Sequence, residues 1–152
     1  MPNIKKVDCQ SKVIYGLQVR TKNANEMNPD TQKIAPLWES FFTEVMPKLL
    51  EGASVYGVYS NYESDAMGTF DVLAGADALE STEGLASITL DEGKYLRFPV
   101  KGEMPQAIIE TWAKVWAYFE DPSIDEKRSF ETDYEQYISE DEAAIYIGVN
   151  YF

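Results

Sequence analysis

The order of helical and extended segments constrains this chain most, because the same succession of elements occurs twice. Residues 13–74 contain an extended run, a helical segment and two further extended runs, and residues 94–149 repeat that order. The two halves share no obvious residue identity, so the repeat is one of arrangement. Two main helices packed on one face of a mostly antiparallel, curved sheet would satisfy both halves, and we therefore predict an α+β fold with a duplicated strand-helix-strand-strand repeat.

Two segments have the periodicity of amphipathic helices. The first covers residues 104–120 and ends where Asp121-Pro122 disfavours helical backbone. Its predicted buried stripe is Ile108, Ile109, Trp112, Val115, Trp116 and Phe119. The second is expected from about residue 35 to 46. Its predicted inner face consists of Leu37, Trp38, Phe41, Phe42 and Val45. A cleft is expected between the two helices, near the axis that relates the two halves.

Short runs rich in β-branched and aromatic residues predict the strands, and glycines or polar clusters separate them. These runs are residues 13–20, 55–59, 69–74, 87–90, 94–100, 134–138 and 144–149. The length of 152 residues is close to the usual size of one domain. We expect one domain over residues 1–152.

Charge and missing residue types exclude several classes of function. The 26 acidic and 13 basic residues give a net charge of −13, so we expect no direct nucleic-acid binding and no attraction to anionic membranes. With no histidine and a lone cysteine, Cys9, the chain cannot form an internal disulfide, a histidine-based triad or a common zinc site. No run approaches the roughly 20 apolar residues of a membrane span, and no signal peptide is evident. We expect a cytoplasmic protein without cofactor or metal, with Cys9 in an N-terminal tail.

A series of short motifs covers nearly the whole chain, and their order and spacing are more specific than any one of them. They are Val13–Leu17, Leu37-Trp38, Val55–Tyr59, Phe70–Gly75, Gly93-Lys94-Tyr95, Trp112 with Trp116, Asp133–Tyr137 and Ile145–Val149. In this order the chain resembles the GyrI-like effector-binding domains, ligand-sensing modules that are fused to AraC-type and MerR-type transcription regulators or occur alone. The resemblance implies the same duplicated fold and the binding of small molecules.

The chain departs from the fused regulators at its start. Those regulators carry a helix-turn-helix ahead of this domain, whereas about twelve residues precede the first predicted strand. We therefore expect a stand-alone sensor or sequestering module without a DNA-binding domain, similar to cationic-drug-binding proteins encoded by integron cassettes. Edge strands could pair two chains into a homodimer, and the sequence identifies neither that state nor any regulator partner.

One predicted strand carries the strongest candidate for ligand contact. Strand alternation puts Asp133, Glu135 and Tyr137 on one face. The resemblance implies that Glu135 is the pocket glutamate, with Tyr134 where the family motif has phenylalanine. A carboxylate removed from water is costly unless it is paired or protonated, and nearby in sequence only Arg128 could fold back onto it. We expect Glu135 to be the counter-ion of a ligand cation.

Aromatic side chains complete the predicted pocket. Each well-placed ring face contributes roughly 0.5–2 kcal/mol of cation-π attraction, which suits lipophilic aromatic cations because they are weakly hydrated. The candidate rings are Trp38, Tyr59, Phe70, Trp112 and Tyr137. Ordinary core packing is the alternative role for each ring. Glu131, which follows Phe130, is the alternative pocket carboxylate.

Two other functions stay open at the level of sequence. The resembled family includes hydrolases of electrophilic small molecules, so Glu135 could act as a general base with Tyr137 or Tyr59 as the second polar group. The family also takes its name from a gyrase inhibitor, so a protein–protein inhibitor with an exposed acidic or apolar surface is the third class. Residues 121–142 contain nine acidic and two basic side chains, a pattern more typical of a solvated surface than of a steering field.

Overall fold

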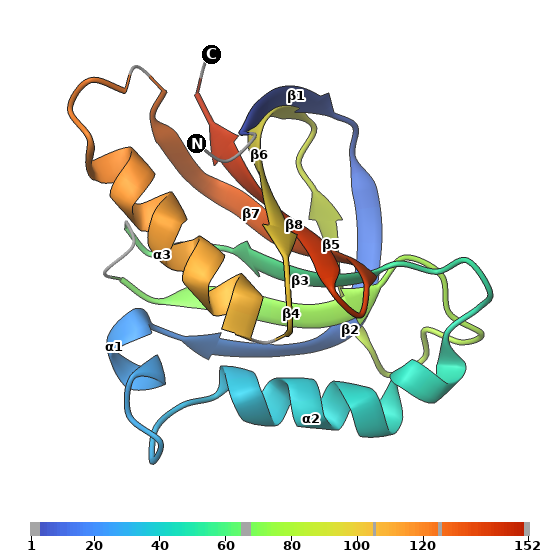
Figure 1. Ribbon diagram of the computed structural model, residues 1–152. Coiled ribbons are helices and arrows are strands. Elements are labelled where there is room, and N and C mark those ends of the chain that lie inside the picture. Colours follow the sequence, from blue (N-terminus) through green and yellow to red (C-terminus); the bar gives the residue numbers. More distant parts are fainter. Residues whose placement is uncertain (1–3, 65–67, 105, 125, 151–152) are drawn as a thin grey trace.

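The computed structural model describes residues 4–64, 68–104, 106–124 and 126–150. These residues form one eight-stranded antiparallel sheet that carries its helices on one face (Figure 1). The strands are β1 (Lys5–Cys9), β2 (Lys12–Thr21), β3 (Val55–Ser60), β4 (Phe70–Ala76), β5 (Ala86–Leu90), β6 (Gly93–Lys101), β7 (Arg128–Ser139) and β8 (Glu142–Val149). The helices are α1 (Asn23–Glu26), α2 (Ile34–Glu44), a 3-10 turn (Met46–Lys48) and α3 (Gln106–Glu120). The predicted α+β fold is confirmed.

The duplication is visible in the order of the strands, β1-β6-β8-β7-β3-β4-β2-β5. The first half contributes β2, α2, β3 and β4, and the second contributes β6, α3, β7 and β8. Within the sheet the halves run β2-β4-β3 and β6-β8-β7, so that β3 and β7 meet at the centre. The pseudo-twofold axis therefore passes between β3 and β7, and residues of these two strands face each other across it.

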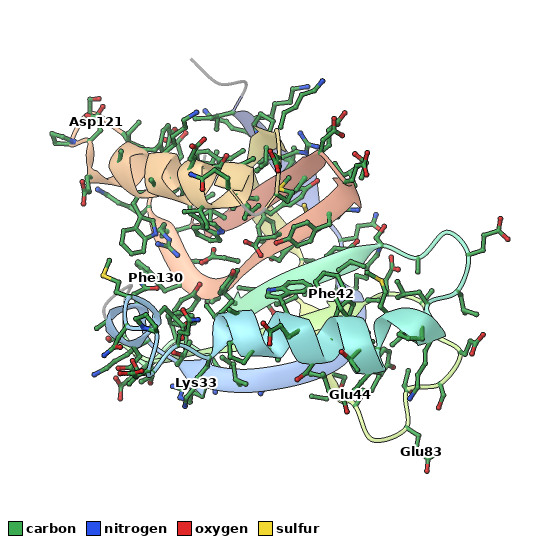
Figure 2. The ribbon with its side chains drawn as sticks, turned by 60° about the horizontal axis from the view of Figure 1, so that its bottom comes forward. Lys33, Phe42, Glu44, Glu83, Asp121 and Phe130 are labelled. Carbon is green, nitrogen blue, oxygen red and sulfur yellow. The ribbon has the colours of Figure 1, made fainter. Side chains whose placement is uncertain are left out.

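Each helix covers its own half of one sheet face, as Figure 1 shows for α2 (cyan) and α3 (orange). In Figure 2, Lys33 and Glu44 mark the two ends of α2, and Asp121 marks the end of α3. Phe41 packs with Val72 beneath α2, and Val115 packs with Ile145 beneath α3. The opposite face has its own apolar cluster, centred on Tyr56, Val58 and Tyr134, to which residues of the flanking strands β1 and β5 contribute.

The buried stripes of both helices are narrower than the sequence pattern predicts. Phe42 is 55% exposed, and on α3 Ile109 and Trp116 are 59% and 37% exposed. On α3 the polar Thr111 takes an inner position instead, because its hydroxyl donates to the Ala107 carbonyl and leaves no unpaired polar group. Large apolar side chains are consequently left on the flank of α3, where they border a cavity described below.

Two stretches of strand were not predicted. Cys9 lies in β1, which pairs with β6, and not in a tail; charged exposed residues such as Lys5 and Lys6 weaken the strand pattern there. Strand β7 begins at Arg128 and not at residue 134. Its first part contains an irregularity in the pairing with β8, and Phe130 has the left-handed backbone value φ = 53°.

The neighbouring pair Phe41 and Phe42 tests the observed helix face. Phe41 is fully buried beneath α2, so Phe41→Ala should lower the free energy of unfolding by about 3–5 kcal/mol. Phe42→Ala removes the same atoms from a largely exposed position and should cost less than about 1 kcal/mol. Urea unfolding of both variants measures the two values, and similar losses would mean that the helix is rotated about its axis.

Candidate functional site

A buried carboxylate lies at the centre of the sheet. Glu135 of β7 stands opposite Gly57 of β3 and is 3% exposed. A Cβ atom at position 57 would lie 2.6 Å from Glu135 Oε1 and 3.1 Å from the Trp38 ring atom Cζ2. Because glycine has no side chain, the carboxylate can lie across the β3 backbone, underneath Trp38.

Uncharged aromatic donors hold this carboxylate. Trp112 Nε1 donates to Glu135 Oε2 at 2.7 Å, and the Tyr137 hydroxyl donates to Oε1 at 3.2 Å. The Tyr59 hydroxyl is a further hydrogen-bond donor to it. Burial raises the pKa of Glu135 to about 7, and the hydrogen bonds from Trp112, Tyr137 and Tyr59 only partly oppose this. Among the described residues no Lys or Arg forms a salt bridge with Glu135.

The rings predicted for the site cluster around Glu135 in two groups, which the carboxylate joins through Trp112 and Tyr137. The centroids of Trp38 and Tyr137 are 5.4 Å apart, and those of Tyr59 and Trp112 are 5.2 Å apart, both pairs edge to face. Phe70 is one ring further from the carboxylate and meets Tyr59 at 6.0 Å. The six predicted residues, drawn from α2, β3, β4, α3 and β7, are thus brought together.

A cavity of about 350 Å³ lies beside this cluster. It is bounded by α1, α3 and the sheet, and its lining includes Tyr59, Tyr62, Phe70, Trp112, Trp116 and Arg128. Glu135, Trp38 and Tyr137 do not line it. The carboxylate instead lies directly behind Tyr59 and Trp112, whose polar atoms point away from the cavity toward it.

Comparison with known proteins identifies the family. The chain matches the family model of Cass2, described as integron-associated effector binding protein, over residues 5–149. The chain belongs to this family. A solved Cass2 relative, the integron cassette protein VCH_CASS2 from the mobile metagenome of Vibrio cholerae, is 42% identical with a TM-score of 0.91. That alignment covers 97% of this chain and 95% of the other.

A curated relative and a second solved structure extend the comparison. The putative transcriptional regulator protein YobU of Bacillus subtilis (strain 168) is 31% identical over 132 residues, covering 80% of this chain and 78% of YobU. The structure of SAV2435 bound to tetraphenylphosphonium has a TM-score of 0.73 at 18% identity, with 97% and 94% of the two chains covered. At that identity the likeness establishes a shared fold.

Other carboxylates near the predicted site lie in different surroundings. Glu131 is exposed and borders a separate, polar hollow of about 310 Å³, away from the aromatic cluster. Arg128 pairs with Asp133 at 2.7 Å rather than with Glu135. Glu26 caps α2, because its carboxylate accepts from the backbone N–H groups of Lys33 and Ile34 at 2.9 and 3.0 Å.

Several residues near the site were missed at the level of sequence. Gly57 is essential to the placement of Glu135, and its position between Tyr56 and Val58 of a predicted strand was a signal for close approach. Tyr62 and Arg128 line the cavity, but neither belongs to a pattern that suggests it. In the part of the chain that the structure describes, no cluster of three or more His, Cys, Asp or Glu side chains could hold a metal ion. No described helix is long and apolar enough to cross a membrane.

The raised pKa of Glu135 predicts how the free energy of unfolding changes with pH. Since the folded protein holds this proton more tightly than the unfolded chain does, ionisation of Glu135 destabilises the fold as pH rises from about 4.5 to about 7. Glu135→Gln lacks this charge, so its stability relative to the unaltered protein should increase between pH 5 and pH 8, by a few kcal/mol. Urea unfolding at both pH values measures the difference. Glu131→Gln, at an exposed position of the same strand, is the control, and an equal pH effect in both variants would contradict the assignment.

Proposed function

We propose that this protein binds lipophilic, aromatic cations, with the Glu135 carboxylate as counter-ion. One observation carries the proposal: the Glu135 carboxylate, with 3% exposure, has aromatic hydrogen-bond donors and no salt bridge to a Lys or Arg among the described residues. An apolar cavity lies on the other side of two of those rings. An anion left unneutralised in a desolvated site attracts a cation far more strongly than one in water. Sensing or sequestering such compounds is the role that follows.

The cation would lie against Tyr59 and Trp112. Their ring faces attract positive charge, and both rings donate hydrogen bonds to the carboxylate behind them. These hydrogen bonds to an anion push electron density into the rings. The negative potential of the ring faces is thereby strengthened on the cavity side. Glu135 would thus act on the ligand through the rings, without leaving its hydrogen bonds.

Membership in an effector-binding family supports a small ligand, and a protein of the same fold, SAV2435, has been solved bound to tetraphenylphosphonium. The cavity volume of about 350 Å³ is within the range of small-molecule sites. For a ligand of about 25 heavy atoms, about −0.3 kcal/mol per atom gives about −7.5 kcal/mol, or micromolar affinity.

Geometry favours binding over the hydrolase alternative. A general base must reach a proton of its water or substrate within hydrogen-bond distance. The Glu135 oxygens instead accept from Trp112, Tyr137 and Tyr59, and the carboxylate does not line the cavity.

A matched ligand pair tests the counter-ion. Methyltriphenylphosphonium and triphenylphosphine oxide have nearly the same shape, but only the first is charged. Quenching of tryptophan fluorescence at pH 8 should give at least about tenfold tighter binding of the cation, because the ring faces and Glu135 act on charge alone. In Glu135→Gln the preference should fall to the smaller part that the ring faces contribute, while Glu131→Gln keeps it in full. Equal affinities for the two ligands in the unaltered protein would contradict the proposal.

Proton competition gives an independent test. Because the pKa of Glu135 is about 7, the carboxylate is mostly neutral at pH 6 and mostly charged at pH 8. Affinity for the phosphonium should therefore rise with pH and level off above about pH 8, with close to a tenfold change per unit well below the pKa. The affinity of Glu135→Gln should be flat over this range. A flat profile in both proteins would argue against Glu135 as the counter-ion.

A further inference from the structure

A second buried carboxylate near the cavity differs from Glu135 in having a cation of its own. Asp133, two residues earlier on β7, is fully buried. Its Oδ2 atom accepts from Arg128 Nη2 at 2.7 Å and from the Tyr62 hydroxyl at 2.6 Å, and its Oδ1 atom accepts from the Gly148 N–H at 3.0 Å. Asp133 and Glu135 therefore share a sheet face but differ in their partners, because Asp133 belongs to an internal ion pair.

The cation of this pair is part of the cavity wall. Arg128 lines the cavity, and its side chain is only 9% exposed. The guanidinium carbon lies 4.5 Å from the centroid of the Phe130 ring. The ring centroids of Tyr62 and Phe130 are 5.7 Å apart, in a T-shaped arrangement. Arg128 thus combines a ring face with a buried carboxylate, which is the environment proposed for the ligand cation next to Glu135.

The backbone of β7 creates this arrangement. The pairing of β7 with β8 is irregular between Arg128 and Asp133, and Phe130 within it has φ = 53°. In Figure 2, Phe130 lies in the region between α3 and α1. The irregular segment allows the Arg128 side chain to reach Asp133, five residues later, over the face of Phe130.

We propose that Arg128 restricts the cavity to ligands with a single positive charge, an inference that rests on the proposed function. Arg128 neutralises Asp133, which would otherwise be a second counter-ion, and it is the member of this ion pair that lines the cavity. A second cationic group on a ligand would therefore meet the guanidinium side of a neutralised pair and find no free carboxylate there.

Glu26, the one carboxylate among the described residues that line the cavity, is not available to a second cationic group. It accepts hydrogen bonds from the Lys33 and Ile34 backbone N–H groups and from the Thr21 hydroxyl at 2.6 Å. Its charge is committed to the positive end of α2. Specificity for monocations therefore follows from which carboxylates already have a partner.

The hydrogen bonding of Arg128 indicates that its charge matters more than its full donor set. Nη2 binds Asp133, but Nε is buried and makes no hydrogen bond within the described chain. A buried N–H without a partner is unfavourable, so an unbranched apolar side chain at this position would remove that penalty, although it leaves the Asp133 carboxylate buried without its cation. Arg128→Met keeps much of the length and the contact with Phe130 while it removes the charge.

Ethidium and propidium provide the test, because they share a phenanthridinium ring and propidium adds a quaternary ammonium on one arm. Dye fluorescence at pH 8 and 0.15 M salt should show that the unaltered protein binds ethidium at least about tenfold more tightly. This preference opposes the general attraction of a chain with net charge −13 for the dication. Equal binding, or tighter binding of propidium, would overturn the inference.

Three variants separate the effect of the Arg128 charge from the effect of the space that its side chain fills. Arg128→Met frees Asp133 and should reverse the preference in favour of propidium. Arg128→Met combined with Asp133→Asn opens the same space without the carboxylate, so its ratio should lie close to one. Arg20→Gln changes the net charge by the same amount at an exposed ion pair with Asp71 and should leave the ratio of the unaltered protein intact.

The outcomes distinguish this inference from the proposed function. If neither dye binds the unaltered protein, the proposed function fails. If both dyes bind but the ratio is near one, or if Arg128→Met leaves it unchanged, only the role of Arg128 fails. Should near-ultraviolet circular dichroism show that Arg128→Met does not fold, the double variant decides: loss of the monocation preference supports the inference, and its retention overturns it.

Discussion

The site depends on the carboxylate of Glu135, which is buried without a salt bridge to any Lys or Arg in the described ranges. Removing a charge from water is expensive, and uncharged hydrogen-bond donors offset only part of that cost. The raised pKa of Glu135 expresses the remainder. The ionised form of Glu135 is therefore unfavourable in the folded protein. The proposed ligand would stabilise that form, because it supplies a weakly hydrated positive charge. Stability and binding are therefore linked through one proton.

The duplicated fold explains how such a group can be buried at all. The two halves meet at β3 and β7. Helix α2 packs mainly on β2 and β4, and α3 packs mainly on β6 and β8, so the central strand pair lies between the two helices. Trp38 of α2 and Trp112 of α3 both reach the carboxylate region across this junction. Gly57 leaves space on the facing strand. Each half supplies one wall, and neither half would enclose the site alone.

Much of this was predictable because it depends on local pattern. The helical and strand periods gave the repeat, and strand alternation put Glu135 and Tyr137 on one face. The rings at the site were predicted partly from the resemblance to effector-binding domains. What the sequence could not give were relations between distant strands: the contact of Gly57 with Glu135, and the cavity that ends at Tyr59 and Trp112 in front of the carboxylate. Register between β3 and β7 has no local signature.

Charge partners were the least predictable feature. Arg128 is close to both Asp133 and Glu135 in sequence, and only the irregular start of β7 determines that it pairs with Asp133. A positive φ at Phe130, a residue type that rarely adopts it, left no trace in composition. The edge strand β1 was missed for a related reason: its exposed charged residues protect a sheet edge and hide the strand pattern.

Counting the protons released when a lipophilic cation binds tests the central claim most directly. Calorimetric titration with methyltriphenylphosphonium, in buffers of different ionisation enthalpy, measures this number. Ionisation of Glu135 on binding predicts release of about one proton at pH 6, falling to nearly none above pH 8, and none at either pH in Glu135→Gln. Binding without proton release at pH 6 would show that the ligand does not draw on this carboxylate.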